Sequence, residues 1–133
     1  MILLDSDVVI DILRGYPPAL SWLDAQEGLE IGLPGFVIME LLQGCRNLDE
    51  QQELERETKR YQIVWPSPEA CGKALATFAH HRLSLGLTML DALIGHTAVG
   101  EGQTLQTFNQ RRYRVIRELA TVRPYAKQTE ART

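Results

Sequence analysis

The stretch ILLDSDVVI, residues 2–10, decides the fold of this chain. Its first three residues form a short apolar run that is typical of a buried strand. The apolar residues after Asp7 recur at helical spacing until Gly15 ends the pattern. A strand that passes directly into a helix predicts an α/β unit. Asp5 falls at the carboxyl end of the predicted strand, where parallel α/β sheets bind their ligands.

The same alternation continues along the chain. Further strands are predicted at residues 29–33, 63–65, 103–108 and, weakly, 119–122, and helices at residues 17–23, 36–42, 48–61, 68–85 and 88–101. Strands separated by helices predict an α/β fold, a single-domain α/β/α sandwich with a central, mostly parallel sheet. The length of 133 residues suits one domain, which we place at residues 1–124, followed by a short basic C-terminal tail at residues 125–133.

Composition places the chain among ordinary globular proteins. Hydrophobic residues make up 44% of it and charged residues 23%. No segment approaches the roughly 20 apolar residues of a membrane span, and the N-terminus lacks the basic leader of a signal peptide. Cys45 and Cys71 stand alone, which suits reduced thiols better than a disulfide framework. We therefore expect a cytoplasmic protein that does not bind a membrane.

Charge is unevenly distributed along the chain. The net charge is −3, yet residues 109–133 hold seven Lys or Arg and only two acids. Such a basic region attracts a polyanion near one site, or it is a solvated tail that contacts an acidic partner. The composition leaves both interpretations open.

Three isolated acids, Asp5, Glu40 and Asp91, lie within otherwise apolar runs that contain no basic residue. Carboxylates are almost never buried without a partner, because desolvation of the charge is costly. A divalent cation that prefers oxygen ligands, Mg²⁺ or Mn²⁺, would satisfy several carboxylates together. Each acid also has a structural alternative: Asp5 as a helix N-cap, Asp91 in a capping box with Thr88, and Glu40 as the buried partner of an arginine.

Four segments resemble the PIN-domain ribonucleases, in particular the VapC-type toxins of bacterial toxin-antitoxin pairs. They are ILLDSDVVID (2–11), ELLQG (40–44), DALIGHTA (91–98) and TFN (107–109), and their order and spacing agree with the family over about residues 1–116. The resemblance implies an endoribonuclease that hydrolyses RNA phosphodiester bonds with a metal-activated water. It also implies Mg²⁺ or Mn²⁺ as cofactor, a cognate antitoxin protein as partner, and a homodimer.

The resemblance also assigns roles to individual residues. Asp5 and Asp91 would be direct metal ligands, and Glu40 would complete the ligand set or hold a metal-bound water. Ser6 and Thr107 would orient the carboxylates through their hydroxyl groups. We expect the loss of any of the three acids to abolish turnover while the fold stays intact.

The chain departs from the family at the fourth acidic position. Many members carry an acid at position 109 or three residues later, where this chain has Asn109 and Arg112. Asn109 is a neutral oxygen donor that would position a metal-bound water in catalysis, whereas Arg112 cannot bind a cation. We expect Arg111 and Arg112 to bind RNA phosphates beside the site; alternatively they are solvated or meet an acidic partner.

Two other functions are compatible with parts of the sequence. The DSDVV segment after an apolar strand also resembles the opening of haloacid-dehalogenase-like phosphatases, although the downstream Lys and acidic pair of that family have no clear counterpart. The other alternative is a catalytically weakened PIN-like module that binds RNA or a protein. Hydrolysis of small phosphomonoesters, cleavage of polymers, or neither activity would distinguish phosphatase, nuclease and binding module.

Overall fold

The structure is a computed structural model that describes residues 1–127 of the chain. Strands and helices alternate along these residues. In chain order they are β1 (Ile2–Leu4), α1 (Ser6–Leu13), α2 (Pro17–Ala25), β2 (Ile31–Pro34), α3 (Gly35–Gln43), α4 (Leu48–Thr58), β3 (Gln62–Val64), α5 (Pro68–Leu85), α6 (Met89–Glu101), β4 (Leu105–Gln106), α7 (Gln110–Tyr113) and β5 (Thr121–Val122).

The strands pair in parallel within one sheet, in the order β3-β2-β1-β4-β5. Parallel neighbours require crossover connections, and helices supply these between consecutive strands. The first strand lies at the centre of the sheet, with Leu3 opposite both Gly32 of β2 and Leu105 of β4. The expected central parallel sheet is therefore confirmed, and every pair within the described residues is parallel.

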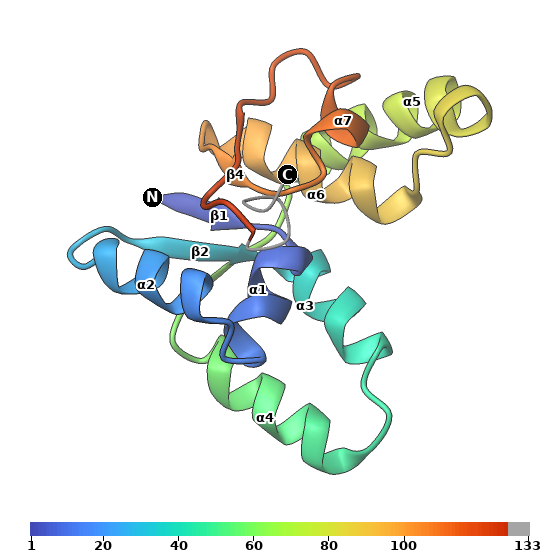
Figure 1. Ribbon diagram of the computed structural model, residues 1–133. Coiled ribbons are helices and arrows are strands. Elements are labelled where there is room, and N and C mark those ends of the chain that lie inside the picture. Colours follow the sequence, from blue (N-terminus) through green and yellow to red (C-terminus); the bar gives the residue numbers. More distant parts are fainter. Residues whose placement is uncertain (128–133) are drawn as a thin grey trace.

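Helices cover both faces of the sheet, which confirms the expected sandwich (Figure 1). In this view α1, α2 and α4 lie below the strands, and α5 and α6 lie above them. The strand side chains of Leu3, Leu4, Leu33 and Leu105 are fully buried between these layers. Removal of this apolar surface from water is the main force that holds the layers together.

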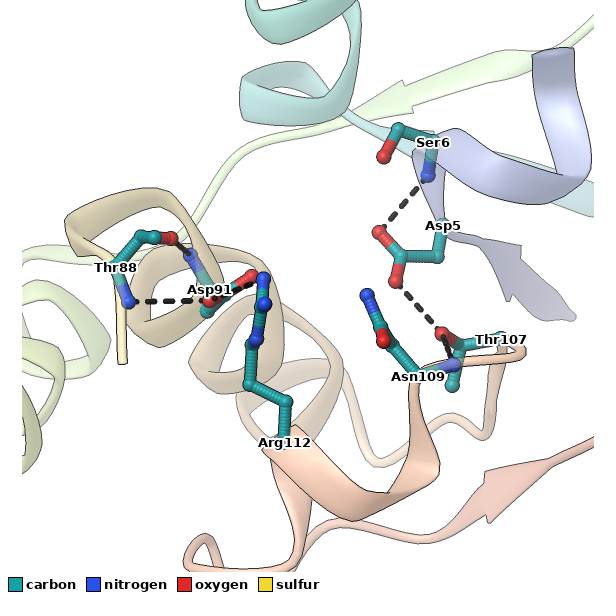
Figure 2. A network of polar contacts seen from close by, with 7 residues as sticks. All are labelled: Asp5, Ser6, Thr88, Asp91, Thr107, Asn109 and Arg112. Carbon is teal, nitrogen blue, oxygen red and sulfur yellow. Dashed lines mark hydrogen bonds and ion pairs between the residues drawn. The ribbon is translucent and has the colours of Figure 1, made fainter. Parts of the chain in front are cut away.

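The edge formed by the carboxyl ends of β1 and β4 positions the candidate site. Leu4 pairs with Gln106, so the residues that follow them, Asp5 and Thr107, come next to each other. Helix α6 begins at its N-cap Thr88 and brings its own first turn to the same region. Asp5 and Asp91, which are 86 positions apart in sequence, thus lie in the same region of the molecule (Figure 2).

The short helix α7 was not predicted from the sequence, because four residues without an apolar period give no helical signal. Its approach to α6 depends on Gly95. A Cβ atom at this position would lie 2.4 Å from Cδ1 of Ile116 and 3.4 Å from Cδ1 of Tyr113. The absent side chain therefore lets the chain after α7 pack directly on α6.

Some element boundaries differ from the sequence prediction. Helix α4 ends at Thr58 rather than at Tyr61. The chain must leave the helix earlier because Gln62 already pairs with Gly32 in the sheet. The predicted strand at residues 103–108 is limited to Leu105–Gln106 for a related reason, since β4 forms ladder pairs only over these two residues.

The end of the described chain packs against α1. The Tyr125 hydroxyl donates a hydrogen bond of 2.7 Å to Oδ2 of Asp11, and Lys127 forms an ion pair with the same carboxylate. Residues 128–133 of the expected tail lie outside the described residues, so the boundary at residue 124 stays a prediction. In residues 1–127 no helix has the length and apolar character needed to cross a membrane.

Candidate metal-binding carboxylate site

Asp5 follows β1 and caps α1, and both of its carboxylate oxygens accept hydrogen bonds (Figure 2). Oδ1 accepts a hydrogen bond of 2.8 Å from the backbone N–H of Ser6, and Oδ2 accepts one of 2.8 Å from the Thr107 hydroxyl. The Thr107 oxygen in turn accepts from the backbone N–H of Asn109 at 3.0 Å. The N-cap alternative for Asp5 is therefore correct, but capping leaves lone pairs on both oxygens.

The environment of Asp5 disfavours its negative charge. Burial, followed by the nearby charge of Asp7, raises the pKa of Asp5 from 3.8 to about 6, although hydrogen bonds from Thr107 and Ser6 and the Tyr113 hydroxyl oppose this rise. None of its contacts within residues 1–127 is with a cationic side chain. A bound cation would offset the electrostatic cost that the fold imposes on this carboxylate.

Asp91 combines a capping role with a second contact. Its Oδ2 accepts the backbone N–H of Thr88 at 3.1 Å, and its own N–H donates to the Thr88 hydroxyl at 3.1 Å, so the capping box expected as an alternative is present. Arg112 Nη1 lies 3.4 Å from the same oxygen. Oδ1 of Asp91 accepts no hydrogen bond from a described residue, so one oxygen of the carboxylate remains available.

Tyr113 hydrogen-bonds to Asp5 and lies within the electrostatic influence of Asp91, and the sequence did not predict its place in the site. Its side chain is buried, and burial together with the charges of Asp5, Asp91 and Asp7 raises its pKa far above the ordinary value. The hydroxyl group therefore stays protonated, and it interacts electrostatically with both candidate ligands, Asp5 and Asp91. No sequence signal distinguishes this tyrosine, because its position depends on how α7 packs.

Asp7 is a further acid at this end of the sheet that the sequence analysis gave no role in the site. Its Oδ2 accepts a hydrogen bond of 3.0 Å from the backbone N–H of Phe108, which ties α1 to the chain after β4. Burial raises its pKa, and the hydrogen bonds from Phe108 and Val8 and the charge of Lys127 partly oppose the rise. The sequence signal that could have placed Asp7 near the site was its spacing of two residues from Asp5.

Glu40 lies apart from the hydrogen-bond network of Asp5. It is half-buried on α3 and lines a groove of about 490 Å³ between α1, α3 and α4, which Ser6 lines as well. The arginine partner considered from the sequence is not found, because no hydrogen bond or ion pair joins the Glu40 carboxylate to a described residue. Ser6 contacts Asp5 through its backbone N–H and not through the expected hydroxyl.

The basic residues after β4 occupy two kinds of position. Arg111 is exposed, whereas the Arg112 guanidinium reaches Asp91 and so has the acidic partner that the sequence analysis left as an alternative. Asn109 is exposed at the N-terminus of α7. In Figure 2 its side-chain amide points toward the Asp5 carboxylate.

The donor set fits a hard divalent cation such as Mg²⁺ or Mn²⁺. Among the described residues Asp5 is a buried carboxylate that has no cationic partner, and Oδ1 of Asp91 accepts no hydrogen bond. Mg²⁺ is usually held by one or two carboxylates together with water and substrate oxygens. Within residues 1–127 no three Asp, Glu, His or Cys side chains already form a metal cluster. The residues therefore suit a site with few protein ligands.

The fold and these carboxylates define an α/β protein with an acidic site at the carboxyl ends of parallel strands. Residues 2–118 match the model of the PIN domain, so the chain belongs to the PIN domain family. This membership excludes the phosphatase alternative. The lysines in the middle of the chain lie on or next to polar helices: Lys59 is the C-cap of α4, and Lys73 on α5 pairs with Glu69.

Several solved structures with the same fold are toxin-antitoxin complexes. The toxin-antitoxin complex from Klebsiella pneumoniae contains a chain with a TM-score of 0.74 and 23% identity, and the match covers 96% of this chain and 100% of that one. VapBC2 from Rickettsia felis bound to a promoter DNA fragment gives a TM-score of 0.75, 21% identity, and coverage of 92% and 98%. DNA-bound VapBC from Salmonella typhimurium gives a TM-score of 0.75, 19% identity, and coverage of 92% and 98%. No curated protein matches the sequence.

Proposed function

We propose that the protein is a metal-dependent endoribonuclease that acts as the toxin of a type II toxin-antitoxin pair. The observation that carries this proposal is the Asp5 carboxylate, which is buried with a raised pKa and lacks a cationic partner among the described residues, in a PIN-domain fold. A divalent cofactor would offset the electrostatic cost of burying such a carboxylate. The similarity of the fold to toxin-antitoxin complexes supports the choice of class.

Asp5 and Asp91 would hold Mg²⁺ or Mn²⁺, and Glu40 would retain a coordinated water from the α3 side. The bound cation would activate a water for attack on phosphorus and neutralise charge in the transition state. Thr107 fixes one oxygen of Asp5, which keeps the carboxylate oriented toward the site. Asn109 offers a neutral amide that would position the attacking water.

The region after β4 would bind the RNA backbone. Arg111 on α7 and Arg114 at its C-cap are exposed, and Arg112 contacts Asp91. Cationic side chains bind phosphates without reading the base sequence, so binding and cleavage should weaken steeply with salt.

A cognate antitoxin is the partner that the proposed function requires. The groove between α1, α3 and α4 combines apolar side chains such as Ile10 and Leu41 with the acids Glu40 and Glu53. It therefore suits an amphipathic segment with basic residues, and such a segment would reach Glu40. We also propose a homodimer, and a cytoplasmic location that fits the free cysteines Cys45 and Cys71.

Cleavage of RNA by the purified chain, free of antitoxin, tests this function. Mixed tRNA and rRNA are incubated with the protein in Mg²⁺, in Mn²⁺ and in EDTA, and the Asp91→Asn variant is run in parallel to exclude a contaminating nuclease. We expect cleavage that requires the cation and disappears in the variant. Equal cleavage by the variant would refute the assigned site.

The alternative of a binding module without turnover has one observation in its favour, the Arg112 guanidinium at Asp91. It predicts that the folded protein retains RNA on a filter in Mg²⁺ and leaves the RNA intact. The cleavage assay and a filter-binding assay on the same samples separate the two functions.

A further inference from the structure

The pair between Asp91 and Arg112 joins a candidate metal ligand to a cation that the chain itself supplies (Figure 2). Nη1 of Arg112 lies 3.4 Å from Oδ2 of Asp91. The Asp91 side chain is only 9% exposed, whereas that of Arg112 is 43% exposed. An arginine of the chain therefore partly neutralises the carboxylate that the proposed function assigns to a divalent cation.

We propose that Arg112 is an exchangeable counter-ion of Asp91, which competes with the divalent cation for this carboxylate and so sets the cation concentration at which the site fills. The inference rests on the proposed metal site and adds a residue that weakens cation binding. It assigns Arg112 a role that differs from RNA binding alone.

The geometry of the pair allows the exchange. Its single contact of 3.4 Å lacks the two parallel hydrogen bonds that make the strongest arginine–carboxylate pairs. Arg112 stands on a helix of four residues and has solvent beside it, so its side chain can leave without disturbing the core. Asp91 stays oriented after the departure, because the N–H of Thr88 still binds Oδ2.

Electrostatics makes the exchange necessary. A divalent cation on Asp91 would lie within a few ångströms of the guanidinium, and like charges at that separation repel strongly near a protein surface. Within residues 1–127 Asp91 is the one ion-pair partner of Arg112, whose side chain is partly exposed to solvent. The displaced side chain would therefore turn to solvent or to a phosphate of bound RNA.

Titration calorimetry with Mn²⁺ measures this competition without any need for activity. The proteins compared are wild type, Arg112→Gln and Arg117→Gln, with thermal melting to verify the fold of each. Arg117 is an exposed arginine of the same segment without an ion pair in the described residues, so its variant controls for the loss of one positive charge. We expect Arg112→Gln to bind Mn²⁺ about fivefold more tightly, the size of effect typical of a partly exposed ion pair, and Arg117→Gln to match wild type.

A double-mutant comparison attributes the effect to Asp91. In an Asp91→Asn background the substitution of Arg112 should no longer change Mn²⁺ affinity, because the shared partner is gone. Equal or weaker Mn²⁺ binding by Arg112→Gln would overturn the inference and leave the metal site standing. An absence of Mn²⁺ binding in every protein would overturn both the inference and the metal dependence of the proposed function.

Discussion

Asp5→Asn is expected to stabilise the metal-free protein at neutral pH, although it removes a candidate metal ligand. The asparagine Oδ1 can keep the cap to Ser6, and its amide can donate to the Thr107 oxygen. The substitution removes a negative charge that burial disfavours. The raised pKa of Asp5, about 6 in the folded protein against 3.8, reflects this cost.

The magnitude and sign follow from the two pKa values. A rise of about two pKa units corresponds to about 3 kcal/mol. Below pH 4 both states carry the proton and the cost is absent. Between pH 4 and 6 the unfolded state loses its proton first, so the stability of the wild type falls as the pH rises. Above pH 6 the full cost remains, and Asp5→Asn avoids it.

Urea unfolding in EDTA at pH 7.5 and at pH 4 measures the effect. At pH 7.5 the variant should be more stable by up to about 3 kcal/mol, which is a rise in Tm of about 10 °C for a domain of this size. At pH 4 the two proteins should be alike. Added Mg²⁺ should stabilise the wild type and not the variant, because a ligand stabilises only the state that binds it.

The control is Asp24→Asn, which removes the same charge from an exposed residue without an ion pair in the described chain. It should change stability little at either pH. A metal-free wild type that is more stable than Asp5→Asn at pH 7.5, or a difference that does not depend on pH, would refute the argument that burial makes this charge costly.

Three smaller predictions concern the contacts around the site. Thr107→Val removes the hydroxyl that binds Oδ2 of Asp5, so calorimetry should show Mg²⁺ affinity reduced by about tenfold, with unchanged affinity as the contradicting result. Thr88→Ala removes the cap of α6 and should cost about 1 kcal/mol in urea unfolding, whereas Thr88→Ser should cost much less. Lys127→Met removes the ion pair with Asp11 and should destabilise the fold by about 1 kcal/mol, an effect that should become smaller in an Asp11→Asn background because one of the contacts of Lys127 is then already lost.

Much of the fold was predictable because its signals are local. Helix α5 was predicted with the observed limits, since Ser67 caps it, Pro68 begins it and Gly86 ends it in the left-handed conformation. The start of α6 at Thr88 followed from its capping box in the same way. The strand limits were less accurate, because a strand extends only as far as its neighbours pair with it.

The sequence by itself determined the order of strands and helices, the caps at Asp5 and Asp91, and the placement of these acids in apolar runs, since each depends on residues close together in the chain. Only the tertiary structure decided which groups meet. The pairing of β1 with β4 brings Thr107 to Asp5, and the packing of the chain after α7 on Gly95 brings Arg112 to Asp91. Thr107 and Asp5 are 102 positions apart in sequence, and Arg112 and Asp91 are 21 positions apart. Such long-range contacts arise from the packing of whole elements rather than from local preference.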